Sequence, residues 1–138
     1  MAPAALTPDG RLRAVRVRIA HAVAEAGRDA AAVRLLAVSK TFDAAAVREL
    51  AACGQLEFGE NYLQEALEKQ AALADLPLMW HFIGPIQSNK TRAIAEHFSW
   101  VHGIDRLKIA ERLSAQRPPD MSPLQVCVQV NVSGEASK

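Results

Sequence analysis

The residue of this sequence best suited to covalent chemistry is Lys40, which follows an apolar segment. Leu35 to Val38 are four apolar residues in a row, and Ser39 and Lys40 come directly after them. Such a run is typical of a parallel-sheet strand covered on both faces. A lysine at the carboxyl end of a parallel strand lies where α/β folds place their chemistry. From position alone, a lysine that only solvates the strand end remains the simpler alternative.

Other polar residues end predicted strands in the same way: Glu60-Asn61, His81 with Gly84, His102-Gly103, and Asn131. The carboxyl ends of parallel strands meet at one rim, so we expect these side chains to gather around Lys40. A lysine desolvated between apolar strand ends has a more nucleophilic amine. Schiff-base formation with a carbonyl compound is the reaction that such a lysine performs best, and pyridoxal phosphate is the commonest aldehyde partner.

Competing kinds of site find little support in the sequence. The four histidines show no HExxH spacing, so we expect no metal site. No GxGxxG, GxxxxGK[ST] or GxSxG segment occurs, which argues against a nucleotide-phosphate loop and a nucleophile elbow. Cys53 and Cys127 lie far apart without a CxxC spacing and predict no disulfide framework.

The elements that would position Lys40 alternate along the chain. A first helix is expected from the Thr7 cap and Pro8 to Gly27, and later helices from Asp43 to Gly54, Tyr62 to Leu73, Pro85 to His97, and from an Asp105 cap onward. Strands are expected at residues 34–40, 56–61, 78–84, 99–105 and 124–132. This alternation indicates a parallel α/β sheet with right-handed crossovers. Periodicity leaves open whether the sheet is doubly wound or part of a β/α barrel, which needs about 250 residues when complete.

The composition narrows the class of protein. The chain has 138 residues, of which 50% are hydrophobic and 22% charged, as in one globular domain. A formal net charge of +1 gives no electrostatic reason to expect a nucleic-acid or membrane partner. The opening residues do not resemble a secretory signal, and no apolar run is long enough to span a bilayer. We therefore expect a cytoplasmic protein.

Five segments together resemble a known family. AVSKTF, FGENYLQEA, WHFIGPIQSNK, VHGID and QVNVSGEASK are similar, in that order, to the N-terminal half of the pyridoxal phosphate homeostasis proteins (YggS/PROSC type, alanine racemase N-terminal-domain-like). The resemblance implies a TIM (β/α)8 barrel of the alanine-racemase type, here truncated to about five strands, with residues 1–138 as a partial barrel domain. It also implies a cytoplasmic monomer that binds pyridoxal 5'-phosphate, with dimerisation open to a truncated chain.

The resemblance assigns roles to individual positions. Lys40 matches the lysine of the VSK motif, which forms the Schiff base. Asn61 matches a residue beside the cofactor ring. His81, Ile83 and Gly84 match the strand-end motif that lines the same pocket. From the residues alone, Asn61 could be only a helix cap, and His81, between Trp80 and Phe82, could be a hydrogen-bonded core histidine.

The sequence also departs from the family. The SMGM-type and RxG-type segments that hold the cofactor phosphate, and the arginine facing the pyridine nitrogen, do not occur in it. The leading hypothesis is a non-catalytic pyridoxal phosphate carrier for cofactor homeostasis, with pyridoxal-phosphate-dependent apoenzymes as recipients. A racemase-like enzyme is the alternative and needs a second acid or base opposite Lys40. A third hypothesis is a half-barrel that binds nothing and associates through exposed edge strands.

Overall fold

The computed structural model describes residues 7–136, and its core is a parallel sheet of five strands in the order β1-β2-β3-β4-β5. The strands are β1 (Ala37–Val38), β2 (Glu57–Glu60), β3 (Met79–Phe82), β4 (Trp100–Ile104) and β5 (Gln125–Val128). Each strand pairs in parallel with the next along the chain. A sequential order of this kind is singly wound, as in a β/α barrel, and it decides against the doubly wound alternative.

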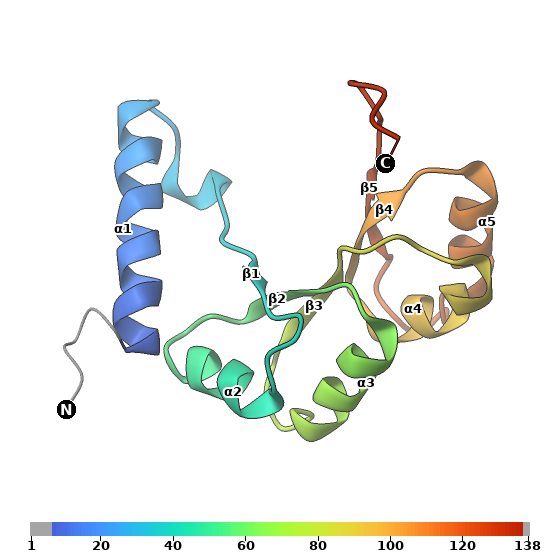
Figure 1. The fold of residues 1–138 in the computed structure, drawn as a ribbon, viewed down its shortest axis with the longest axis horizontal. Helices are drawn as coiled ribbons and strands as arrows, with labels where there is room; N and C mark the ends of the chain where they lie inside the picture. The colour runs from blue at the N-terminus through green and yellow to red at the C-terminus, as the bar shows by residue number, and fades with distance from the viewer. Residues whose placement is uncertain (1–6, 137–138) are drawn as a thin grey trace.

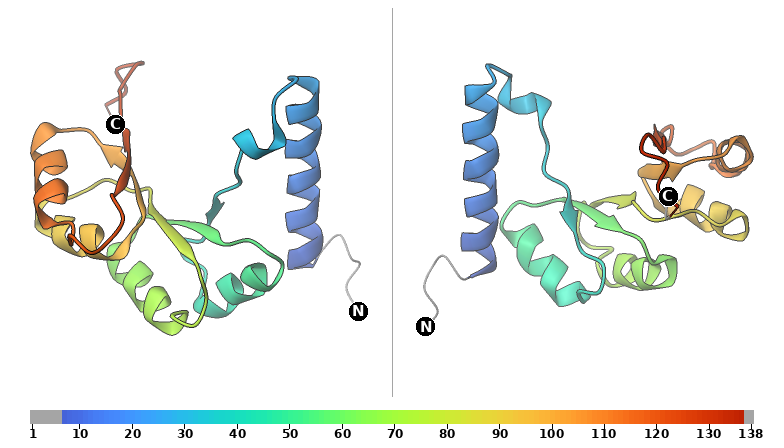
Figure 2. Two further views of the ribbon diagram at one scale, coloured as in Figure 1. Left: turned by 180° about the vertical axis from the view of Figure 1, so that it is seen from behind. Right: turned by 45° about the horizontal axis from the view of Figure 1, so that its top comes forward.

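The helices cover one side of the sheet. They are α1 (Pro8–Glu25), α2 (Ala44–Ala52), α3 (Leu63–Ala72), α4 (Thr91–His97) and α5 (Leu107–Gln116), with short 3-10 turns η2 (Ala30–Ala32) and η3 (Ser88–Lys90). Helices α2 to α5 follow the outer, convex side of the curved row of strands, while α1 stands at the β1 end (Figure 1). The view from behind and the view tilted by 45° show the same order, with α1 and α5 at opposite ends (Figure 2).

Strand alternation divides the residues between the two sides of the sheet. Phe58, Trp80, Phe82 and Val101 are buried and form the core with helix residues such as Val47 and Ile109. Their neighbours along the strands face the concave side, which carries no helix (Figure 1). The core of this chain therefore lies between the sheet and its helices.

Several helix ends follow the expected capping residues. Thr7 Oγ1 accepts a hydrogen bond from the Gly10 amide at 3.0 Å, and Asp43 Oδ1 accepts one from the Ala46 amide at 2.9 Å. Both caps satisfy amides that the first turn of a helix leaves without a partner. The expected Asp105 cap is wrong: Arg106 is the N-cap of α5, and Asp105 instead accepts a bond from Arg106 Nε.

The largest differences from the expected elements are at the first strand and the fourth expected helix. Residues 34–40 were expected as one strand buried on both faces, whereas β1 has only two residues and Val38 is 51% exposed. Val38 lies on the concave side, where no element covers it. The helix expected from Pro85 begins only at Thr91, after an extended segment and η3, and the Thr91 hydroxyl donates to the Ser88 carbonyl oxygen at 3.0 Å.

Candidate functional site

Lys40 lies in a β-turn that follows β1. The turn comprises Ser39 to Phe42, called here the lysine turn, and the Phe42 amide donates to the Ser39 carbonyl oxygen at 3.1 Å. Lys40 is exposed, so the expectation that apolar strand ends desolvate its amine is wrong. The next residue, Thr41, has a φ of +68°, a conformation that β-branched residues rarely adopt. The sheet therefore delivers an accessible amine on a turn with an unusual backbone.

A buried network fixes the lysine turn to the sheet and to α3. Ser39 is buried; its amide donates to the Gly59 carbonyl oxygen at 2.9 Å, and its hydroxyl contacts the Glu60 carboxylate. Glu60 is fully buried and forms an ion pair with Lys69 Nζ at 2.9 Å. Lys69 also donates to the Ser39 carbonyl oxygen at 2.7 Å.

Lys69 is a buried residue beside the lysine turn that the sequence interpretation missed. It is 5% exposed, because it lies on the same face of α3 as the buried residues Ala66 and Leu73. A lysine three residues after Ala66 and four before Leu73 continues an apolar helical stripe, and this spacing could have indicated a buried partner for Glu60.

Asn61 occupies the rim beside the lysine turn. In the β1–β2 register Val38 pairs with Gly59, so Lys40 and Asn61 each stand two residues beyond that pair. Asn61 is half-buried, and within the described residues its Oδ1 atom is buried without a hydrogen-bond partner. A buried acceptor of this kind normally has a partner, so a ligand that donates a hydrogen bond would fit here.

Ile83 and Gly84 continue the rim after β3. The Ile83 amide donates to the Glu60 carbonyl oxygen at 2.8 Å, and the Ile83 side chain lies over Gly59 on the concave side. A Cβ atom on Gly84 would lie 2.6 Å from Asn61 Cβ, and one on Gly103 would lie 2.8 Å from the Gly84 carbonyl oxygen. Glycine is therefore required at both positions for the strand ends to approach each other.

His81 lies deeper on the concave side, two residues before Ile83. Its Nε2 atom is 3.0 Å from Glu57 Oε1, its Nδ1 atom is 2.9 Å from His102 Nε2, and its ring stacks on Trp100 at 5.5 Å. Burial lowers the pKa of His81 although the bond to Glu57 opposes that shift, and burial also lowers the pKa of His102. Both ring nitrogens of His81 are engaged within this cluster, so it fits the hydrogen-bonded alternative as well as a pocket lining.

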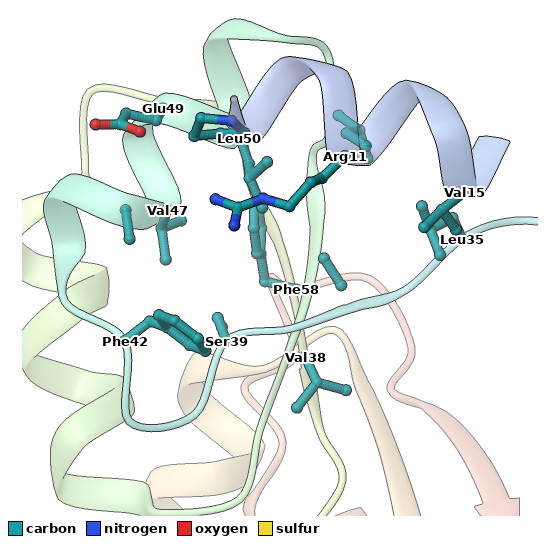
Figure 3. Close-up of a pocket in the computed structure, with 14 residues that line it drawn as sticks. Arg11, Val15, Leu35, Val38, Ser39, Phe42, Val47, Glu49, Leu50 and Phe58 are labelled. Atoms are coloured by element: carbon teal, nitrogen blue, oxygen red, sulfur yellow. The ribbon is translucent and has the colours of Figure 1, made fainter. Parts of the chain in front are cut away.

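Two cavities lie on opposite sides of the segment around β1. One of about 560 Å³ lies between α1, α2 and the segment around β1, with Val15, Leu35 and Phe58 among its lining residues (Figure 3). Ser39 and Phe42 reach its edge, but Lys40 is not among its lining residues. A second cavity of about 200 Å³ lies against the histidine cluster on the concave side. The accessible amine of Lys40 thus stands at an open rim.

The described residues contain neither a cluster of metal ligands nor a membrane-spanning helix. Within residues 7–136, no three histidine, cysteine or acidic side chains gather as a metal site would require. None of the helices described is long and apolar enough to cross a membrane. Cys53 and Cys127 are both free thiols, as their spacing predicted.

The residues present fit the aldehyde end of pyridoxal phosphate. Lys40 supplies an accessible amine, Asn61 an unpartnered acceptor, and Gly84 a rim free of side chains. The segments expected to hold the cofactor phosphate do not occur in this sequence. The fit therefore concerns the covalent end of the cofactor.

Comparison with known proteins agrees with this geometry. A family profile described as the alanine racemase N-terminal domain matches residues 12–135. A Pseudomonas aeruginosa protein named pyridoxal phosphate homeostasis protein is 73% identical over 124 residues, covering 90% of this chain and 54% of that relative. The protein of the same name from Vibrio cholerae is 54% identical, covering 92% of this chain and 58% of that relative.

A solved structure carries the same arrangement. PipY of Synechococcus elongatus, with pyridoxal phosphate bound, superposes with a TM-score of 0.69 at 45% identity, covering 80% of this chain and 48% of that one. The chain spans about half the length of the relatives it matches. Its five sequentially ordered strands and their helices accordingly match part of a TIM barrel, and the chain, similar in sequence to the pyridoxal phosphate homeostasis proteins, belongs to the family with the alanine racemase N-terminal domain.

Proposed function

We propose that this chain binds pyridoxal 5'-phosphate as a Schiff base on Lys40 and serves intracellular cofactor homeostasis without catalysing a reaction. The observation that best supports this proposal is the exposed amine of Lys40, which lies beside the unpartnered Oδ1 of Asn61. The turn that carries Lys40 is held by the hydrogen bond from Lys69 to the Ser39 carbonyl oxygen. When bound, the cofactor supplies an aldehyde carbon. Lys40 would hold that carbon through its amine nitrogen, with the aldehyde oxygen lost as water, so binding would be reversible and would need no other reactant.

The remaining rim residues have supporting roles in this proposal. Asn61 accepts a hydrogen bond from the cofactor ring or its substituents, and Ile83 gives the ring an apolar contact. Gly84 leaves the rim open, since any side chain there would collide with Asn61. His81 sits below them and holds the concave wall through Glu57 and His102.

A carrier role suits the titratable groups near Lys40 better than racemase-like catalysis does. Glu60 and Lys69 are buried and bound to each other, while His81 is engaged by Glu57 and His102. A racemase needs a second acid or base free to act across the cofactor from the lysine. Storage needs only a reversible bond, and apoenzymes that require pyridoxal phosphate would be the recipients.

The test is spectroscopic. The purified chain is titrated with pyridoxal phosphate, the Schiff-base absorption band is recorded, and the adduct is reduced with borohydride and located by peptide mass. We expect a band in the wild-type chain, a trapped adduct on Lys40, and loss of both in Lys40→Ala. Lys108→Ala removes another exposed lysine, on α5, and is expected to leave the band unchanged.

Each alternative has its own result. Absence of the band in the wild-type chain, or trapping spread over many lysines, would contradict the carrier function and support a half-barrel without binding competence. Interconversion of alanine enantiomers by the loaded chain would support the racemase-like enzyme instead.

A further inference from the structure

The Lys69 ammonium group is the centre of a buried network around the lysine turn. Its three N–H groups meet three partners: the Ser39 carbonyl oxygen at 2.7 Å, the Glu60 carboxylate at 2.9 and 3.1 Å, and Glu65 Oε1 at 3.0 Å. A protonated amine has three hydrogens, so it can donate one to each of these three residues. Lys69 is thus fully occupied by the protein, whereas the amine of Lys40 is exposed.

The same network holds the backbone on both sides of Lys40. Before it, the carbonyl oxygen and hydroxyl of Ser39 contact Lys69 and Glu60. After it, the Thr41 amide donates to Glu65 Oε1 at 2.6 Å, and this carboxylate is itself bound to Lys69. Lys40 is the residue between these two attachments.

The backbone of the lysine turn needs such attachments. Thr41 has a φ of +68°, at the turn position where glycine or asparagine is normally found. A strained conformation of this kind persists only where its surroundings hold it. The carboxylate of Glu65, bound to the Thr41 amide, is the described contact that does so directly.

A buried ion pair is weak grounds for stability, because desolvation of both charges offsets their attraction. Its better-supported use is to specify one conformation. Here Glu60 is completely buried on the helix side of the sheet. Its partner Lys69 reaches it from α3. The pair therefore links the end of β2, the middle of α3 and the lysine turn.

We propose that Glu60 and Lys69 are positioning residues for Lys40. Their ion pair fixes the lysine turn, through Ser39 and through Glu65 and Thr41, so that only the Lys40 side chain remains to be ordered when it meets an aldehyde. The consequence for cofactor binding rests on the proposed function, while the fixing of the turn does not. Holding a reacting group in place lowers the entropy cost of forming its bond.

The test replaces the pair with neutral side chains of similar size, Glu60→Gln with Lys69→Met. Lys69→Met alone would leave a buried carboxylate without a partner and endanger folding, so the double variant is the informative one. The matched control is Arg48→Met with Asp75→Asn, which removes an exposed ion pair of 2.8 Å between α2 and the turn after α3. Both variants are compared with the wild-type chain in thermal melting, amide hydrogen exchange and pyridoxal phosphate titration.

In the neutral-pair variant we expect a cooperative melt, faster hydrogen exchange at the Thr41 amide, and about tenfold weaker Schiff-base formation at Lys40. The control variant is expected to change neither hydrogen exchange at the Thr41 amide nor Schiff-base formation at Lys40. Unchanged exchange at Thr41 in the neutral-pair variant would overturn the proposal. Faster exchange with unchanged Schiff-base formation would overturn it as well, since the network would then be structural only.

Failure of the proposed function has a separate signature. If the wild-type chain forms no Schiff base, the carrier function fails, and the exchange measurement still decides the fixing of the turn. Faster exchange at Thr41 would then support that part, and equal exchange would overturn it. If the neutral-pair variant does not melt cooperatively, Glu65→Gln, which weakens the Thr41 contact from a half-buried position, gives the same comparison.

Discussion

At the residue scale, neighbouring residues at the rim differ in burial: the first is packed against the helices and the next lies at the edge of the sheet. Ser39 and Glu60 are buried toward the helices, whereas Lys40 and Asn61 lie at the rim. Strand alternation points Ser39 and Glu60 to the helix side of the sheet, whereas Lys40 and Asn61 come just after the paired residues. In each pair the first residue is packed against the helices, and in the proposed function the second contacts the cofactor.

Thr41 provides a test of backbone strain beside Lys40. Its φ of +68° costs about 1 kcal/mol relative to glycine, which adopts this conformation freely. We expect Thr41→Gly to stabilise the chain by up to about 1 kcal/mol in urea unfolding, reduced by the larger entropy of glycine in the unfolded state. A clear loss of stability in that variant would mean that the threonine side chain contributes contacts that exceed its strain.

His81 and His102 should make stability depend on pH. Burial lowers the pKa of both below the usual 6.5, so the folded state takes up protons less readily than the unfolded chain. The stability present above pH 6.5 should therefore fall as the pH decreases through 6.5 toward the folded-state pKa values. We expect His102→Gln, which can still donate to His81, to show a smaller loss between pH 7.5 and pH 5 than the wild-type chain.

The control for this pH dependence is His97→Gln, at an exposed position on α4 outside the histidine cluster. This variant should lose as much stability on acidification as the wild-type chain does. Equal losses in the His102→Gln and wild-type chains would show that the buried histidine cluster does not cause the pH dependence.

The accessible part of the site could be predicted from the sequence, and the buried part could not. Lys40, Asn61, Ile83 and Gly84 follow strands, and parallel strands bring their ends to one rim. Lys69 was missed because lysines on helices are usually exposed, and its burial depends on the tertiary contact with Glu60. His81 could be placed on β3 from the sequence, but its contacts with Glu57 and His102 depend on the register of three strands.

At the element scale, the alternation of strands and helices was predicted correctly, whereas some boundaries were wrong. The apolar run before Lys40 predicts a long buried strand, yet β1 pairs with β2 over only two residues. Strand signals in a sequence measure hydrophobicity, while the observed strand depends on which neighbours pair with it. The first strand is also an edge of this sheet, which further limits its length.

Strand β5 forms the other edge and leads to a prediction about association. All four of its residues are exposed, and Val128 and Val130 are 72% and 71% exposed. An exposed edge of this composition favours pairing with another chain. We expect concentration-dependent association in size-exclusion chromatography, reduced by Val128→Lys.

A helix position provides the control for this association. Leu107 at the start of α5 is 74% exposed, so Leu107→Lys removes an equally exposed apolar side chain away from the sheet edge. Association reduced equally by both variants would point to general hydrophobic contact. A monomer at all concentrations would contradict association through the edge.

At the scale of the whole molecule, the five described strands form a curved part of a barrel sheet, and helices cover only its outer side. Helices pack against the convex side of the sheet (Figure 1). The strand register places Val38, Trp100 and the histidine cluster on the concave side. In a closed barrel the interior is filled by side chains from strands on all sides. The exposure of Val38 and the partial exposure of Trp100 follow from this half of the interior standing alone.

This arrangement predicts that a complementary fragment will bind. The part of the Pseudomonas aeruginosa relative that this chain does not match amounts to nearly half of that protein, since the match covers 54% of it. Closing a barrel would pair that part with the free edges of β1 and β5 and cover the concave side. We expect a 1:1 complex and a blue shift of tryptophan fluorescence on mixing.

The two tryptophans make this prediction specific. Trp80 is already buried toward the helices at 8% exposure, whereas Trp100 lies half-buried on the concave side, stacked on His81. The shift should therefore disappear in Trp100→Phe and persist in Trp80→Phe. Val38→Asp, which places a charge on the concave side, should weaken the complex, while Val17→Asp on the exposed side of α1 should not. Binding that leaves Trp100 fluorescence unchanged would show that the fragment does not cover the concave side.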